Sequence, residues 1–152
     1  MTLFWNFLWN LLYKSQKIIL REEWTLKFLY YNKTMDKNKL DEINQLIVDK
    51  KFEEAKAELE KYNPDEEKET EALKLLGLCN VNLEKYKDGQ SNFETVVKYD
   101  PEDASSWFYL ANCYDNLDDV IHAKAAYQKV IELRENFIDA YKNLCVLYVR
   151  CD

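Results

Sequence analysis

Apolar residues in the second half of the chain recur at helical spacing, and polar clusters interrupt them. One helix face is indicated by the i, i+3, i+4, i+7 spacing of Trp107, Leu110, Ala111 and Tyr114. A second stripe of the same kind consists of Ala123, Ala126, Tyr127, Val130 and Ile131. Because residues 115–119 between the stripes are rich in turn-forming Asp and Asn, the pattern predicts two helices joined by a short turn.

These stripes repeat along the chain with a period of 34 residues. Large apolar columns are formed by Leu73, Trp107 and Tyr141, by Leu76, Leu110 and Leu144, and by Leu59, Phe93 and Tyr127. Small residues form two further columns, Gly77, Ala111 and Cys145, and Ala55, Gly89 and Ala123. A glycine inside a helix costs about 1 kcal/mol relative to alanine, so Gly77 predicts a close contact between two helices. Pro101 is expected to end one helix, and Asp103 to cap the next.

The period divides the chain into an N-terminal extension and a repeat domain. We predict a non-repeat segment over residues 1–34 and an all-α tandem repeat over residues 35–152. The expected rows cover about 36–69, 70–103 and 104–137, with a partial row at 138–152.

At these residues the chain resembles the tetratricopeptide repeat (TPR) family. Trp107-x2-Leu110-Ala111-x2-Tyr114, followed by Ala123-x3-Tyr127, is similar to the family signature Trp-x2-Leu-Gly-x2-Tyr, then Ala-x3-Phe. The preceding row departs from it, with Asn80 where Tyr is expected. The resemblance implies tandem helix-turn-helix repeats that form a right-handed α-solenoid, and it implies binding of a protein or peptide partner.

In the resembling family, defined columns of the first helix line the concave face of the solenoid. Those columns hold Glu71, Lys74, Leu78 and Val81, then Ser105, Phe108, Asn112 and Asp115, then Asp139, Lys142, Val146 and Val149. From them we select a candidate peptide-binding groove of Lys74, Leu78, Val81, Phe108, Asn112, Asp115 and Lys142. Its mixed surface could take an extended or helical peptide, and an ordinary solvated face is the alternative.

One specialised form of this groove is not expected. Family members that clamp a chaperone's C-terminal carboxylate use a set of Lys, Asn and Arg on these helices. Leu78, Tyr109 and Asp139 occupy three of those positions here.

Composition and charge narrow the class of partner. The chain has only two Gly and two Pro among 152 residues, which disfavours turn-rich all-β folds. Residues 1–34 carry five basic and two acidic side chains, a net +3, whereas the remainder carries 16 and 26, a net −10. This balance excludes nucleic acid as the main partner of the repeats and favours basic or neutral proteins.

The potentially reactive residues are expected to be structural. No CxxC pair occurs, so a zinc site is not predicted, and reduced thiols favour a cytoplasmic location. Cys79, Cys113 and Cys145 fall in repeat columns and are expected in the core, and His122 is expected on the surface. No phosphate-binding loop, dinucleotide fingerprint or nucleophile elbow is present. We therefore predict no catalytic, cofactor-binding or metal-binding residues, and no enzyme activity.

The two ends of the chain leave alternatives open. Residues 1–34 begin with an apolar helical face too short to span a bilayer. Three interpretations of this segment remain open. It is an upstream extension of a chain that starts at Met35, or it is a helix that packs on the repeats or on a partner, or it is a helix that lies on the cytoplasmic membrane surface. The final row is a single apolar first helix, which predicts a truncated chain or self-association.

These observations favour a non-catalytic adaptor or scaffold that binds a protein segment. A membrane-peripheral assembly factor held by residues 1–34, and a regulatory TPR segment of a longer enzyme, are the alternatives.

Overall fold

Helices account for the regular structure in the parts of the chain that the structure describes. The computed structural model describes residues 37–62 and 70–151, except for the side chain of Cys151. Its helices are α2 (Lys37–Val48), α3 (Phe52–Glu60), α4 (Thr70–Asn82), α5 (Tyr86–Tyr99), α6 (Ala104–Asn116), α7 (Val120–Leu133) and α8 (Ile138–Cys151). These described ranges contain no strand, which confirms the all-α prediction. The interpretations of residues 1–34 lie outside the described residues.

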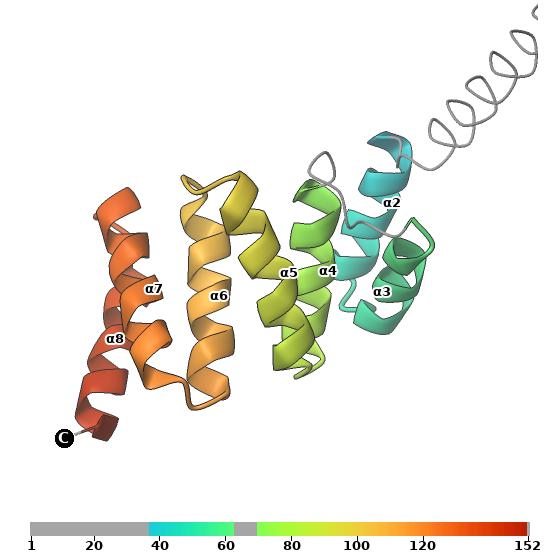
Figure 1. The fold of residues 1–152 in the computed structure, drawn as a ribbon. Coiled ribbons are helices and arrows are strands. Elements are labelled where there is room, and N and C mark those ends of the chain that lie inside the picture. The colour runs from blue at the N-terminus through green and yellow to red at the C-terminus, as the bar shows by residue number, and fades with distance from the viewer. Residues whose placement is uncertain (1–36, 63–69, 152) are drawn as a thin grey trace, which may run out of the picture. The chain divides into compact units, whose positions relative to one another are not determined.

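The described helices are arranged as successive antiparallel pairs. Figure 1 shows α4 beside α5 and α6 beside α7, with α8 following α7 and the α2–α3 pair preceding α4. Each helix contacts the next along the chain, and the first helices α4 and α6 also contact one another. This confirms the tandem helix-turn-helix arrangement predicted from the columns. None of the described helices is both long enough and apolar enough to cross a bilayer.

The first helices α2, α4 and α6 end in the same hydrogen-bonded turn. Lys50, Glu84 and Asp118, spaced by 34 residues, each have a φ of 59°. At the last of these turns the Asp118 amide donates to the Asp115 carbonyl (3.1 Å) and the Asp119 amide donates to the Tyr114 carbonyl (2.9 Å). The other two turns repeat both hydrogen bonds. This pattern is the Schellman motif, in which glycine usually takes the left-handed position. The motif shows the repeat in the α2–α3 pair, where the sequence columns are weakest.

The helix entry predicted at Asp103 is confirmed. Its carboxylate accepts hydrogen bonds from the Ser105 amide (3.1 Å) and the Ser106 hydroxyl (2.8 Å). The indole of Trp107 donates to the Pro101 carbonyl at 2.9 Å, which ties the first turn of α6 to the preceding loop. The Ser105 amide, which would otherwise have no partner at the start of the helix, is thereby satisfied.

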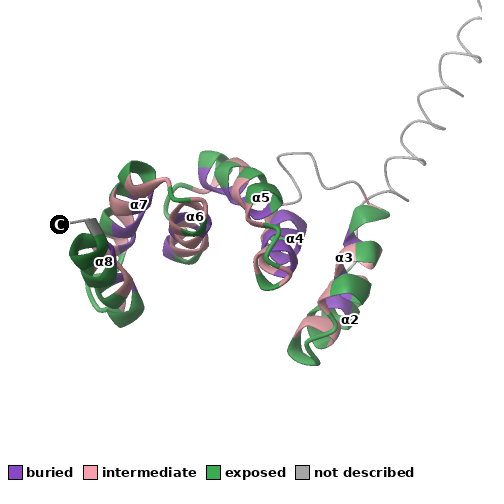
Figure 2. Ribbon diagram, turned by 90° about the horizontal axis from the view of Figure 1, so that it is seen from below, coloured by how far each residue is buried: buried purple, intermediate pink, exposed green. Residues whose placement is uncertain are grey.

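Small residues on one helix face large ones on the next, as the columns predict. A Cβ placed on Gly77 would lie only 2.8 Å from the Phe93 ring. Phe93 is 1% exposed, and Tyr127, in the same column one row later, is fully buried. Figure 2 shows buried residues on the sides of the helices that face their neighbours. Close packing of the pairs therefore depends on a small side chain opposite an aromatic one.

Two of the three cysteines expected in the core are there, and the third prediction was wrong. Cys79 and Cys113 are 0% exposed, and burial raises the pKa of their thiols to about 11 and about 12, so both stay protonated near neutral pH. Cys145 is exposed. It lies in the column of Gly77 and Ala111, but no described helix covers that face of α8.

Candidate functional site

The seven residues predicted from the columns all lie on first helices. Three are on α4, three on α6 and one on α8: Lys74, Leu78 and Val81, then Phe108, Asn112 and Asp115, then Lys142. Six of them are half-buried, and Lys142 is exposed and paired with Asp139 at 3.0 Å. These side chains therefore differ in how much of their surface a partner could reach.

Lys74 is an ion-pair partner inside the array. Its Nζ lies 2.9 Å from the Asp103 carboxylate, and 3.8 and 3.9 Å from Glu71 and Asp100. Desolvation alone would lower the pKa of Lys74, but the hydrogen bond to Asp103 and the surrounding carboxylates raise it overall. For Asp103, burial acts to raise the pKa of its carboxyl, but hydrogen bonds from Lys74 and Ser106 bring it below its usual value. The pair connects α4 to the N-terminus of α6.

Asn112 is a hydrogen-bond acceptor at the junction of α6, α7 and α8. Its Oδ1 accepts from the Tyr127 hydroxyl at 2.6 Å and from Asn143 Nδ2 at 3.1 Å. Asn143 Nδ2 also lies 3.1 Å from the Tyr127 hydroxyl oxygen. One turn further along α6, Asp115 forms an ion pair with Arg150 of α8. Both predicted groove residues thus have polar partners within the array.

Phe108 belongs to a cluster of aromatic rings from α5, α6 and the residue before α8. Its ring centroid lies 4.9 Å from that of Phe137 and 5.7 Å from that of Tyr109. Tyr109 in turn stacks on Phe93 of α5, with 5.4 Å between ring centroids. The sequence interpretation gave no role to Phe137, although it occupies the column of the capping residue Asp103. That departure from the repeat was the available signal.

The remaining predicted residues provide the apolar part of this face. Val81 packs on the core cluster that includes Phe93 and Cys113, and its side chain would lie 3.1 Å from a Cβ placed on Gly89. Leu78 is half-buried on α4. Of the two, Leu78 is not part of that cluster and is the better placed to meet a partner.

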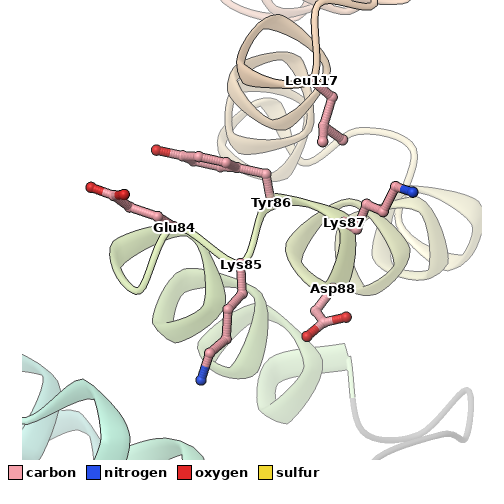
Figure 3. A pocket seen from close by; sticks show the side chains of 6 residues that line it. All are labelled: Glu84, Lys85, Tyr86, Lys87, Asp88 and Leu117. Carbon is pink, nitrogen blue, oxygen red and sulfur yellow. The ribbon is translucent and has the colours of Figure 1, made fainter.

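Two open pockets lie away from these seven residues. One, of about 310 Å³, is lined by Glu84, Lys85, Tyr86, Lys87, Asp88 and Leu117. Figure 3 shows that its side chains point in different directions rather than toward a common centre. The other, of about 540 Å³, lies before α8 and is lined by Arg134, Asn136, Phe137, Ile138 and Asp139. Neither has the converging polar groups of a small-molecule site.

The acidic and histidine side chains give no metal cluster within the described ranges. No group of three or more His, Cys, Asp or Glu residues there could hold an ion. His122 is exposed, as predicted, and its Nδ1 lies 2.8 Å from the Asp119 carboxylate at the start of α7. The hydrogen bond to His122 holds the pKa of Asp119 below its usual value. Asp119 also accepts from the His122 amide, so its role is that of a helix cap.

Comparison with known proteins identifies the repeat. Residues 92–125 match the family model described as tetratricopeptide repeat. The fold is similar to the first TPR of Spaghetti (RPAP3) bound to HSP90 peptide SRMEEVD, with a TM-score of 0.70, 17% identity, and coverage of 77% of this chain and 96% of that one. The fold is also similar to that of MamA, with a TM-score of 0.68 and 21% identity. The alignment covers 72% of this chain and 64% of MamA. YrrB, described as a TPR protein with an unusual peptide-binding site, has a TM-score of 0.66 and 24% identity. The alignment covers 71% of this chain and 56% of YrrB.

The chain spans less than two thirds of the length of MamA and YrrB. No curated protein matches its sequence. At these identities the structural similarity establishes the fold, which is that of a right-handed solenoid of helix pairs. The predicted resemblance is therefore confirmed: the chain contains a tetratricopeptide repeat at residues 92–125, and its described helices have the fold of tetratricopeptide repeat proteins.

Proposed function

We propose that this chain is a non-catalytic adaptor that binds a peptide or protein segment along its first helices. The observation that supports this most directly is the shared fold with the first TPR of Spaghetti, which is bound to a peptide and aligns with 77% of this chain. YrrB, with a peptide-binding site of its own, has the same fold. A rigid row of first helices presents side chains at fixed spacing, which lowers the conformational cost of binding an extended segment.

The contacts within the array limit which groove residues are available to bind a partner. Lys74 and Asn112 already have close polar partners, so their contribution to binding is reduced by the cost of breaking those contacts. Leu78 and the exposed Ser105 lie on the same predicted face, and Ser105 takes part in those networks through its backbone amide rather than its side chain. We infer that a partner segment contacts α4 and α6 at these two positions. The net −10 charge of residues 35–152 favours a neutral or basic segment.

Peptide display followed by direct binding measurements tests this proposal. A random peptide library is selected against the immobilised full chain, and a labelled selected peptide is titrated by fluorescence anisotropy. Leu78→Arg and Ser105→Arg should each weaken binding at least about tenfold, which corresponds to about 1.4 kcal/mol. Gln128→Arg is the control, because it adds the same charge at an exposed position on the second helix α7.

Circular dichroism of each variant checks that its helicity is retained. Equal binding by all three variants would place the peptide on another face, and a selection that yields no binder would contradict the adaptor proposal. The cytoplasmic location stays a prediction. So do the membrane-peripheral alternative, which depends on residues 1–34, and the alternative of a regulatory segment in a longer enzyme.

A further inference from the structure

The junction between α3 and α4 lacks an apolar contact that the junction between α5 and α6 has. Helix α3 has nine residues, whereas α5 and α7, the second helices of the later rows, have 14 each. Near the end of α5, Val97 is 8% exposed and belongs to one core cluster with Leu110 of α6. Its column position in the first row is residue 63, three residues after α3 ends at Glu60. The apolar contact that Val97 makes therefore has no counterpart on α3.

A lysine–asparagine contact joins α3 to α4 instead. Lys56 Nζ donates to Asn80 Oδ1 at 2.7 Å, and Asn80 Nδ2 donates to Asn92 Oδ1 of α5 at 2.9 Å. Asn80 is 2% exposed, and the Lys56 side chain is 13% exposed. In the column of Asn80, α6 has Tyr114, which packs against the core clusters on both sides of it. Polar groups thus fill a place at the α3–α4 junction that an aromatic side chain fills in the next row.

The polar contacts across this junction add little net stability while they are intact. Lys56 Nζ lies 3.9 Å from the Asp88 carboxylate of α5, and such a distant partner offsets only part of the cost of burying the amine. A further ion pair across the junction, Glu53 with Lys85 at 3.1 Å, is exposed and contributes little. Loss of the amine, however, would leave Oδ1 of the buried Asn80 without this donor, which costs more than the intact contact contributes.

We propose that α2 and α3 open from α4 as one unit while α4–α7 stay folded, with Lys56 as the latch that holds them closed. Helices of 12 and nine residues are not stable alone in water, so the pair unfolds locally once it leaves α4. Each repeat of a solenoid is stabilised by its neighbours, so the junction with the least packing opens first. Opening uncovers the side of α4 that carries Cys79 and Asn80, a surface that the closed form does not offer to a partner.

Two cysteines that share a column are probes of this opening. Cys79 on α4 and Cys113 on α6 are both 0% exposed. Burial is the main cause of the raised pKa of the Cys79 thiol, and the charges of Lys56 and Glu53 on α3 also act on it, so this thiol lies at the α3–α4 junction. Cys113 lies at the α5–α6 junction, where its Sγ would be 3.2 Å from a Cβ placed on Gly89. Opening of α2 and α3 therefore exposes Cys79 and leaves Cys113 covered.

Alkylation of the native full chain by N-ethylmaleimide, followed by peptide mass spectrometry, measures both rates in one sample. We expect Cys79 to react at least about tenfold faster than Cys113, because exposure of Cys113 needs a larger unfolding event. The backbone amides of α2 and α3 should also exchange hydrogen for deuterium faster than those of α6 and α7. Equal rates at the two cysteines, or equal exchange in the two helix pairs, would overturn the proposal, because only unfolding of the whole array would then expose them.

Replacing Lys56 with methionine tests the latch. Lys56→Met should increase the Cys79 rate at least about fivefold and leave the Cys113 rate within about twofold, because only the α3–α4 junction is weakened. Lys61→Met is the matched control and should change neither rate, because Lys61 pairs with Glu58 of α3 itself. An unchanged Cys79 rate in Lys56→Met would refute the role of Lys56 as the latch. A parallel rise at both cysteines would refute it too, because Lys56 would then stabilise the whole array.

Discussion

Replacing the left-handed residue of the first-helix turns with glycine should stabilise the protein. Lys50 and Glu84 are exposed and have a φ of 59°. A left-handed conformation costs an L-residue about 1–2 kcal/mol. Glycine removes this cost, but its more flexible unfolded chain offsets about 0.5–1 kcal/mol of the gain. Lys50→Gly and Glu84→Gly should therefore each raise the free energy of unfolding by about 0.5–1 kcal/mol.

The two turns belong to different rows and share no hydrogen bond, so their effects should add. The double variant is expected to gain about 1–2 kcal/mol, or about 4–8 °C in Tm. Urea unfolding followed by circular dichroism at 222 nm measures the free energy, with an unchanged m-value as the sign that the folded state is the same.

A neighbouring lysine supplies the control for this prediction. Lys51 has the same charge and is also exposed, but its φ is −87°. Lys51→Gly should lower the free energy of unfolding by about 0.5 kcal/mol, because glycine there adds only unfolded-state entropy. If Lys50→Gly and Lys51→Gly change stability in the same direction, the reasoning from left-handed strain is refuted.

Three further predictions concern the polar contacts and the groove. Asn112→Ala should lower the free energy of unfolding by about 1–3 kcal/mol, because the buried Tyr127 hydroxyl loses its acceptor, and adding Tyr127→Phe should recover part of the loss in urea unfolding. Asp103→Asn keeps a capping side chain but loses the ion pair with Lys74. Since the folded-state pKa of Asp103 is lowered, its contribution is present above its unfolded pKa and is lost as pH falls through the folded value, so wild type should lose more stability than the variant from about pH 5 to pH 2. The peptide SRMEEVD should show no saturable binding in anisotropy titrations, because Leu78, Tyr109 and Asp139 occupy positions that the carboxylate clamp needs. Saturable binding that weakens with salt would contradict the prediction that this clamp is missing.

The helices could be predicted from the sequence because their packing requires large and small side chains at positions that recur every 34 residues. Gly77 and Phe93 are an example. The ring of Phe93 requires a small residue opposite it, and both residues stand in columns of matching size in the sequence. The left-handed turns leave no such signal. Lys50, Glu84 and Asp118 share a backbone conformation but no chemistry, because packing of the flanking helices imposes the conformation against local preference.

The candidate groove was predictable only in part, for a related reason. A column places a residue on a helix and on a face, and all seven predicted residues lie on first helices. The column does not specify which polar partner a side chain will find. Asn112 bonds to groups from two later helices, and neither partner is implied by its place in the repeat.

A repeat column also does not specify which helix will cover a residue, and this explains the wrong prediction at Cys145 of α8. Ala111 and Cys145 share a column, yet Ala111 is fully buried and Cys145 is exposed. Leu73 and Tyr141 show the same contrast, at 3% and 44% exposed. A repeat residue is buried only where a neighbouring helix covers it, because each repeat of a solenoid contacts only the adjacent repeats. The columns of Leu73 and Ala111, which are core in the inner rows, are therefore exposed on α8, whereas Leu147, in the column of Cys79 and Cys113, is fully buried. Burying apolar area is favourable by about 25 cal/mol per Å², and the inner rows gain this stabilisation in the columns of Leu73 and Ala111, where the residues of α8 are exposed.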